Sequence, residues 1–270
     1  MLQNLVFALT LLAFLMVFCE IYFEVHYPKI TKVKFNTDKL SQDTSFKILQ
    51  VSDVHSGNFT GSVEFIKQIK RQKPDIIVIT GDLINRNTTD FSNAYRFVEE
   101  LVKVTPKVFF VSGNHEWEND RTEDFLQGLK KLNVVILNNK NIIIDFGNTS
   151  INICGVDDFH TERADLGIAA KGINEKFYTI LLSHSPGIVT EKNLPADLIL
   201  SGHTHGGQVR FPVIGGIVAP GQGFFPKLEK GVYNLEHGKK LYIDSGLGTS
   251  VLPIRLFNRS QVSLVTIEGR

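Results

Sequence analysis

The alternation of short apolar runs with amphipathic segments between residues 46 and 137 constrains the fold of this chain more than any other feature. The apolar runs predict strands, and the amphipathic periodicity predicts helices between them. The strands are expected at 46–52, 75–80, 108–111 and 134–137, and the helices at about 62–72, 91–103 and 122–132. Alternating strands and helices predict an α/β domain with a largely parallel sheet of right-handed βαβ units.

The second half of the chain is richer in predicted strands, with a hairpin expected around Gly147. The predicted elements are strands at 141–146, 150–156, 177–182, 197–200, 241–244 and 262–267, and a short helix near 162–171. We expect the last two strands to complete a second sheet. Residues 211–226 are rich in glycine and proline and have no regular period, which is typical of a functional or disordered loop.

The N-terminus carries no charged residue from Leu2 to Cys19. A run of this length predicts a helix that spans a bilayer. A cleaved signal peptide is the alternative, but no basic residue precedes the run and no Ala-x-Ala-like site follows it. We therefore predict a membrane anchor at 1–27, a polar tether at 28–44 and one folded domain at 45–270.

Charge gives weaker predictions. Lys29, Lys32 and Lys34 follow the apolar run and no Lys or Arg precedes it, so the positive-inside rule favours a single-pass protein with its domain in the cytoplasm. The net charge of +1 does not favour nucleic-acid binding. Cys19 and Cys154 lie in different surroundings and do not indicate a disulfide framework.

Polar side chains follow several of the predicted strands. His203 and His205 lie one residue apart between glycines, so their side chains point to the same side of the chain. Four other strand ends carry similar residues. Together the five segments supply Asp53, His55, Asp82, Asn114, His184, His203 and His205. Because ligands of open α/β sheets bind beyond the carboxyl ends of strands, we expect these side chains to form one site.

The donor types point to metal ions. Imidazole and oxygen donors without thiolates suit Mn²⁺, Fe or Zn²⁺ better than a structural zinc or calcium site. Taken singly, Asp53 and Asp82 are also compatible with helix N-caps, and His184 with a core residue. Seven donors exceed the needs of one ion but suit two ions, which can clamp the attacking and leaving oxygens of a phosphoryl displacement.

These motifs, in this order, resemble those of the calcineurin-like metallophosphoesterase superfamily from residue 46 to the C-terminus. They are Asp53-Val54-His55, Gly81-Asp82, Gly113-Asn114-His115-Glu116, His184 and Gly202-His203-Thr204-His205. The resemblance implies a four-layer α/β/β/α sandwich. Gly246-Leu247-Gly248-Thr249-Ser250 and Pro253-Ile254-Arg255 are similar to the bacterial membrane-associated branch, which includes phosphodiesterases and hydrolases of UDP-2,3-diacylglucosamine.

The resemblance also implies roles for the candidate residues. One ion is held by Asp53, His55, Asp82 and His205, and the other by Asp82, Asn114, His184 and His203. A hydroxide between the ions attacks phosphorus in line, and His115 assists the leaving oxygen as a general acid. The implied activity is hydrolysis of a phosphodiester or pyrophosphate, with a lipid or cell-envelope molecule as one candidate substrate.

Three alternatives to that activity stay open: a broad phosphomonoesterase, a nucleotide phosphodiesterase and a non-catalytic binding module. Several side chains also have two interpretations. A metal-orienting role or an exposed loop is possible for Asp157, Asp158 and His160, and Glu116 is either part of the site or solvated. The guanidinium groups of Arg210 and Arg255 bind either substrate or a carboxylate. The rings of Phe224 and Phe225 belong either to the core or to a lipid-facing rim.

Overall fold

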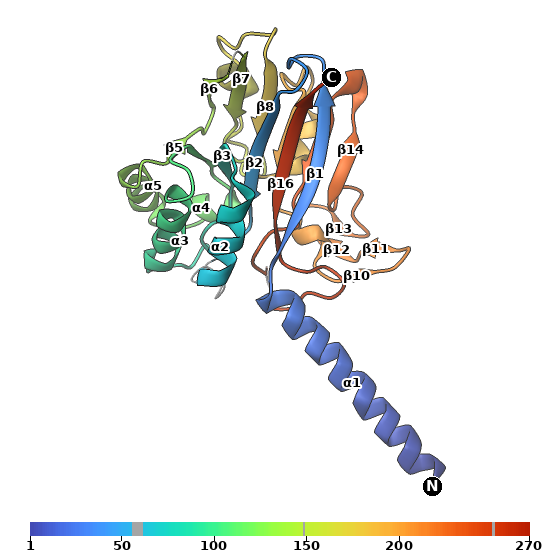
Figure 1. Ribbon diagram of the computed structural model, residues 1–270. Helices are drawn as coiled ribbons and strands as arrows, with labels where there is room; N and C mark the ends of the chain where they lie inside the picture. The colour runs from blue at the N-terminus through green and yellow to red at the C-terminus, as the bar shows by residue number, and fades with distance from the viewer. Residues whose placement is uncertain (56–61, 148, 250–251) are drawn as a thin grey trace.

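Two six-stranded sheets lie face to face and form the body of the protein (Figure 1). The computed structural model describes residues 1–55, 62–147, 149–249 and 252–270. The strand order is β1-β16-β2-β3-β4-β5 in the first sheet and β14-β15-β9-β8-β7-β6 in the second. Helices cover the outer faces, so the predicted four-layer α/β/β/α sandwich is confirmed.

The first sheet contains the predicted βαβ units. Its strands are β1 (Lys29–Thr37), β2 (Ser45–Val51), β3 (Ile76–Thr80), β4 (Val108–Val111), β5 (Val135–Ile136) and β16 (Gln261–Gly269). Strands β2 to β5 are mutually parallel. Their outer face packs against α2 (Val63–Gln72), α3 (Ser92–Val102) and α5 (Thr122–Lys131), whose buried residues share one apolar cluster with the strands. The single turn α4 (Asn114–Trp117) follows β4.

The second sheet is parallel in its centre and antiparallel at both edges. Its strands are β6 (Lys140–Phe146), β7 (Thr149–Gly155), β8 (Tyr178–Leu182), β9 (Leu198–Ser201), β14 (Gly231–Asn234) and β15 (Lys240–Ile243). The short helices α6 (Leu166–Ala169) and η2 (Pro186–Thr190) cover its outer face. The helix expected near 162–171 is thus a single turn.

The core between the sheets explains why the strands are apolar on both faces. In β2, Phe46 and Ile48 point into the space between the sheets, whereas Leu49 and Val51 belong to the cluster under the helices. Successive side chains of a strand point to opposite faces. Since both faces are covered, the alternation of apolar and polar residues fades into continuous apolar runs.

The tether predicted at 28–44 is wrong for residues 29–37. These residues form β1, which pairs with β16 in parallel along its whole length. Phe35 is buried between the sheets, with Val33 packed beside it, whereas Lys32 and Lys34 lie on the other face. Lysines on an edge strand hinder pairing with other chains, and they also make the strand look like a polar tether.

Two further expectations need correction. The strand predicted at 262–267 lies in the first sheet between β1 and β2, and only the strand predicted at 241–244 joins the second sheet. A continuous apolar run indicates that a strand is buried on both faces, but it does not indicate which of the two sheets the strand joins. The segment 211–226 is not without structure. It lies in two small hairpins, β10 (Arg210–Phe211) with β11 (Gly215–Gly216) and β12 (Val218–Ala219) with β13 (Gly223–Phe224).

The helix α1 (Leu2–His26) leaves the domain as a single rod (Figure 1). Among the residues that the structure describes, it is the one helix long and apolar enough to cross a membrane. Its 25 residues rise about 37 Å, compared with a hydrocarbon core of about 30 Å.

Candidate metal centre

The predicted site residues lie at the carboxyl ends of strands in both sheets. Asp53 and His55 follow β2, and Asp82 follows β3. The other residues follow β4, β8 and β9, and they are Asn114, His115, His184, His203 and His205. All are buried except His115, which is partly exposed. The two sheets therefore bring all eight residues to one end of the sandwich.

The side chains form two adjoining groups of buried residues, and the partly exposed His115 forms a third group with His55 and Asp82. Asp53, His55 and His205 each place one donor atom within 4.8 Å of the others, and so do Asp82, His184 and His203. In the first group, His55 Nε2 lies 3.1 Å from His205 Nε2. In the second group, His184 Nε2 lies 3.0 Å from His203 Nδ1. Donors bound to one ion at about 2.1 Å lie about this far apart.

Asp82 connects the two groups. Its Oδ2 lies 3.2 Å from His184 Nε2 and 3.7 Å from His55 Nε2. Its Oδ1 accepts the backbone N–H of His115 at 3.0 Å. A carboxylate between two sets of imidazoles is in the position of a bridging ligand.

The outer hydrogen bonds of two imidazoles define which nitrogen faces the cluster. Thr80 O can only accept, so His184 donates its Nδ1–H to it at 2.8 Å. His55 Nδ1 bonds Asn85 Oδ1 at 2.9 Å, and the Asn85 amide group donates to His55 O. Both Nε2 atoms then face the carboxylates, which is the orientation that such outer hydrogen bonds impose on metal-ligating histidines.

Unpaired buried atoms also indicate a ligand. Asn114 Oδ1 has no hydrogen-bond partner among the described residues. His203 Nε2 and His205 Nδ1 are also unpaired, but they are the ring nitrogens opposite those that meet His184 and His55. Buried polar atoms are normally paired, and exceptions often mark an ion or water position. The donor set and the unpaired Asn114 oxygen fit divalent cations.

The backbone at the site adopts an uncommon conformation. Positive φ angles occur at Asp53 (50°), His55 (48°), Asp82 (51°), His203 (69°) and His205 (50°). Such conformations cost about 1–3 kcal/mol each and persist where the surrounding structure enforces them, typically at functional sites. At Gly202, any side chain would collide with Ser52 and Asp53. This explains the glycine before the His-x-His pair.

Burial and mutual charge shift the pKa values in the cluster. Burial lowers the pKa of His55 to about 4 and that of His203 to about 3, so both imidazoles are neutral at pH 7. Burial opposes a charge on His184, but the Asp82 carboxylate raises its pKa well above the usual value. Burial raises the pKa of Asp53 to about 7, against the opposing effect of His184. Neutral imidazoles are the form that binds metal.

Glu116 holds two of the ligand loops together. Its Oε2 accepts N–H groups from Asp82 at 2.9 Å and Gly113 at 2.7 Å, and its Oε1 accepts that of Leu83 at 2.7 Å. The side chain is fully buried, so a solvated position is wrong. Burial, and next the Asp82 charge, raise its pKa to about 7. Its spacing from Gly113 is that of a helix-capping glutamate, which is the signal that could have placed it.

His115 lies at the edge of the cluster. Its ring is 4.7 Å from the His55 ring, and its Nδ1 accepts the backbone N–H of Arg86 at 3.2 Å. The Arg86 side chain also approaches His115 Nε2 and pairs with Glu118 at 3.0 Å. Burial lowers the pKa of His115. Sequence analysis missed Arg86, as it missed Asn85, because no motif marks either residue.

The other candidates lie outside the cluster. Asp157 and Asp158 are buried rather than exposed, and Asp157 accepts the Trp117 indole N–H at 2.5 Å. His160 is exposed, with its ring 5.3 Å from that of His203. Arg255 is buried and donates to the carbonyls of Ser245, Gly248 and Asn258, and Arg210 pairs with Glu229. Both guanidinium groups therefore have structural partners.

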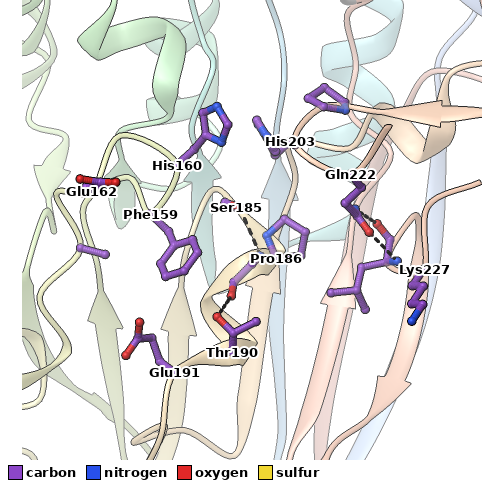
Figure 2. A pocket seen from close by; sticks show the side chains of 15 residues that line it. Phe159, His160, Glu162, Ser185, Pro186, Thr190, Glu191, His203, Gln222 and Lys227 are labelled. Carbon is purple, nitrogen blue, oxygen red and sulfur yellow. Dashed lines mark hydrogen bonds between the residues drawn. The ribbon is translucent and has the colours of Figure 1, made fainter. Parts of the chain in front are cut away.

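Two cavities adjoin the cluster. One of about 530 Å³ is lined by Asp82, His115 and His205. The other, of about 880 Å³, extends from His203 and His160 to Glu191 between the walls of Phe159 and Pro186 (Figure 2). His160 and His203 line both cavities, so a substrate at the cluster has room on two sides.

Comparison with known proteins identifies the class. The profile of the calcineurin-like phosphoesterase family matches residues 46–207, and the chain belongs to this family. Among its relatives is an uncharacterized metallophosphoesterase of Aquifex aeolicus (strain VF5), with 32% identity over 92% of this chain and 95% of the relative. The uncharacterized metallophosphoesterase YkoQ of Bacillus subtilis (strain 168) is 31% identical over 86% of this chain and 89% of YkoQ.

A bovine relative is named a transmembrane protein with metallophosphoesterase domain. It is 29% identical over 90% of this chain and 57% of its own length. Among solved structures, the sulfate thiohydrolase SoxB of Thermus thermophilus superposes with a TM-score of 0.53 at 13% identity, over 85% of this chain and 57% of SoxB. At that identity the likeness shows the fold alone. Family membership together with the Asp and His groups implies phosphoester hydrolysis at a binuclear divalent metal site.

Proposed function

We propose that this protein hydrolyses a phosphodiester or pyrophosphate with two divalent ions held at the carboxyl ends of the strands. The observation that carries the proposal is the position of Asp82 between the two groups of imidazoles. We assign Asp53, His55 and His205 to one ion and Asn114, His184 and His203 to the other, with Asp82 shared. Mn²⁺, Fe and Zn²⁺ all suit this donor set.

When bound, the ions would supply a nucleophile at neutral pH and neutralise the charge of the phosphoryl group. The protein residues would do the rest. Glu116 keeps Asp82 and the Gly113 turn in register through their backbone N–H groups. His115, partly exposed beside Asp82, would donate a proton to the leaving oxygen.

A lipid or cell-envelope substrate is favoured by the surroundings of the site. The apolar helix α1 supports a single-pass membrane protein, and the three lysines after it support a cytoplasmic domain. The larger cavity has apolar walls at Phe159, Pro186 and Leu228, which would accommodate an apolar group. A phosphomonoesterase or a nucleotide phosphodiesterase would use the same centre. A binding module would not need His115.

The test is hydrolysis of bis-p-nitrophenyl phosphate against p-nitrophenyl phosphate by the full chain in detergent. The full chain is needed because a start near Thr44 would remove β1 from the first sheet. The protein is stripped of metal and then given Mn²⁺, Zn²⁺ or Fe²⁺. The proposal predicts metal-dependent cleavage of the diester and little of the monoester. Preference for the monoester would identify a phosphatase, and metal binding without hydrolysis of either ester would contradict catalysis.

A further inference from the structure

Large apolar side chains are exposed around the two small hairpins. Phe224 is 75% exposed and Phe225 64%, so neither belongs to the core. We call this exposed set the apolar rim, and it comprises Phe211, Val213, Ile214, Val218, Phe224, Phe225, Leu252 and Phe257. Exposed apolar clusters of this kind mark interaction surfaces.

The exit of α1 is fixed to the domain rather than loosely tethered. Glu24 in the last turns of α1 is buried, and its side chain accepts the backbone N–H of Asn258 at 2.8 Å. The backbone N–H of Ser260 donates to Glu24 O at 2.9 Å, and Lys29 N–H donates to Ser260 O at 2.9 Å. The Arg259 guanidinium lies 4.5 Å from the centre of the Phe23 ring. These contacts define the direction in which the helix leaves the domain.

The segment that fixes α1 also carries part of the apolar rim. Residues 252–257 lead directly into the helix contacts, and Leu256 O accepts the backbone N–H of Arg210 in β10 at 2.9 Å. Figure 1 shows the hairpins β10 to β13 at the same end of the domain as the exit of α1, on the side toward which the helix leans. A bilayer that contains α1 therefore meets this end of the domain.

The apolar rim continues into the metal centre. The cavity of about 530 Å³ is lined by Asp82 and His115 at one end and by Val218 and Leu252 of the rim, with Ile254 beside them. A molecule at the membrane surface could thus place a phosphoester at the cluster while its apolar part stays against the rim.

We propose that the apolar rim inserts into the membrane interface and that the site takes a phosphoester with a lipid tail from the same bilayer that holds α1. The choice of substrate rests on the proposed function, whereas the insertion does not. The occupant is a bilayer because α1, fixed beside the rim, is itself exposed along its apolar length. A second copy of the chain is the rival occupant that the test must reject.

The experiment measures depth in the membrane. The full chain carries Phe224→Cys with Cys19→Ala, since Cys154 is buried and escapes labelling in the folded protein. An NBD-labelled sample is reconstituted in phosphatidylethanolamine–phosphatidylglycerol vesicles. The matched control is Ile143→Cys, an exposed apolar position in β6 at the opposite end of the domain (Figure 1). We expect a blue shift and quenching by nitroxide lipids at 224 and neither effect at 143. Equal iodide quenching at both positions would overturn the insertion.

Two further readouts separate the alternatives. A blue shift at 224 without quenching by nitroxide lipids, together with crosslinking between Phe224→Cys chains, would show that a second copy covers the rim. The double variant Phe224→Ser, Phe225→Ser should hydrolyse vesicle-bound hexadecyl p-nitrophenyl phosphate at least about tenfold more slowly. A tenfold change corresponds to about 1.4 kcal/mol, and burial of a single Phe side chain contributes that much or more. Its activity on bis-p-nitrophenyl phosphate should be unchanged. Equal loss on both would overturn lipid uptake, whereas an inactive parent protein would refute the proposed function alone.

Discussion

The metal centre and the apolar rim lie close together but are built in opposite ways. At the centre, polar side chains are buried and fixed by the ends of five strands. At the rim, apolar side chains are exposed on two-residue strands and loops. This difference indicates that the strands of the sandwich position the side chains of the metal centre, whereas the loops of the rim determine which substrate reaches it. Substitutions at the centre should therefore abolish the reaction, and substitutions at the rim should change only what reaches it.

The largest effect is expected for Asp82→Asn. Asparagine keeps the shape of the Asp82 side chain but removes the negative charge that lies between the two groups of histidines. Loss of an outer-shell partner already costs about 10–100-fold in affinity or activity, so loss of the shared ligand should cost at least about 100-fold. Diester hydrolysis and metal content are measured together. Asp120→Asn, at an exposed position, is the control and should behave as wild type.

His115→Ala should reduce kcat by about 10²–10⁴-fold, the usual contribution of a general acid, and retain the metals. The loss should be larger for an ester with an alkoxide leaving group than for p-nitrophenyl esters. Metal content by mass spectrometry and kcat on both esters are the measurements. Loss of metal would instead make His115 a ligand, as its grouping with His55 and Asp82 allows. His237→Ala, an exposed histidine, is the control.

Glu116→Gln tests the support of the centre. The amide turns an N–H₂ group toward backbone donors that Glu116 now satisfies. Leaving a buried donor unpaired costs about 1–3 kcal/mol in the free energy of unfolding. We expect a lower Tm and about 10–100-fold weaker metal binding. Glu123→Gln on the exposed face of α5 should change neither, and an unchanged Tm for Glu116→Gln would contradict the role assigned to it.

Metal affinity should fall as the pH drops below about 7. In the metal-free chain, burial raises the Asp53 pKa from 3.8 to about 7, so Asp53 is protonated below that pH. Against the opposing effect of burial, the Asp82 carboxylate raises the pKa of His184, which therefore adds a second proton for an ion to displace. Displacing these protons weakens apparent binding about tenfold per pH unit for each proton released. Calorimetry in buffers of different ionisation enthalpy measures the released protons. Affinity that is constant between pH 6 and pH 8 would exclude proton displacement at the centre.

The smallest effect is expected for Val213→Ser in the apolar rim. This side chain is fully exposed, so its replacement should change the free energy of unfolding by less than about 0.5 kcal/mol. Hydrolysis of soluble esters should also be unchanged. A large drop in Tm would show that the rim packs against another part of the protein, and the contrast with the metal centre would fail.

The sequence was sufficient for the parts that local physics determines. The βαβ alternation predicted β2 to β5 and their helices, and the polar residues after the strands pointed to seven side chains that the structure brings to one end of the sandwich. The family resemblance added His115. Prediction from the sequence failed where position depends on distant partners. β1 looked like a tether because its lysines face outward, and β16 could not be assigned to a sheet from its own residues. Asn85 acts through side-chain contacts that no motif reports, whereas the capping spacing of Glu116 from Gly113 is a local signal for its position.

The most direct test of the central claim is the number of ions and their coupling. The full chain is loaded with Mn²⁺, and metal content and the electron paramagnetic resonance spectrum are recorded together. The shared position of Asp82 predicts two ions per chain with an exchange-coupled spectrum, which Asp82→Asn replaces by the spectrum of isolated Mn²⁺ or abolishes. One ion per chain, or two uncoupled ions in the wild type, would contradict a binuclear centre built around Asp82.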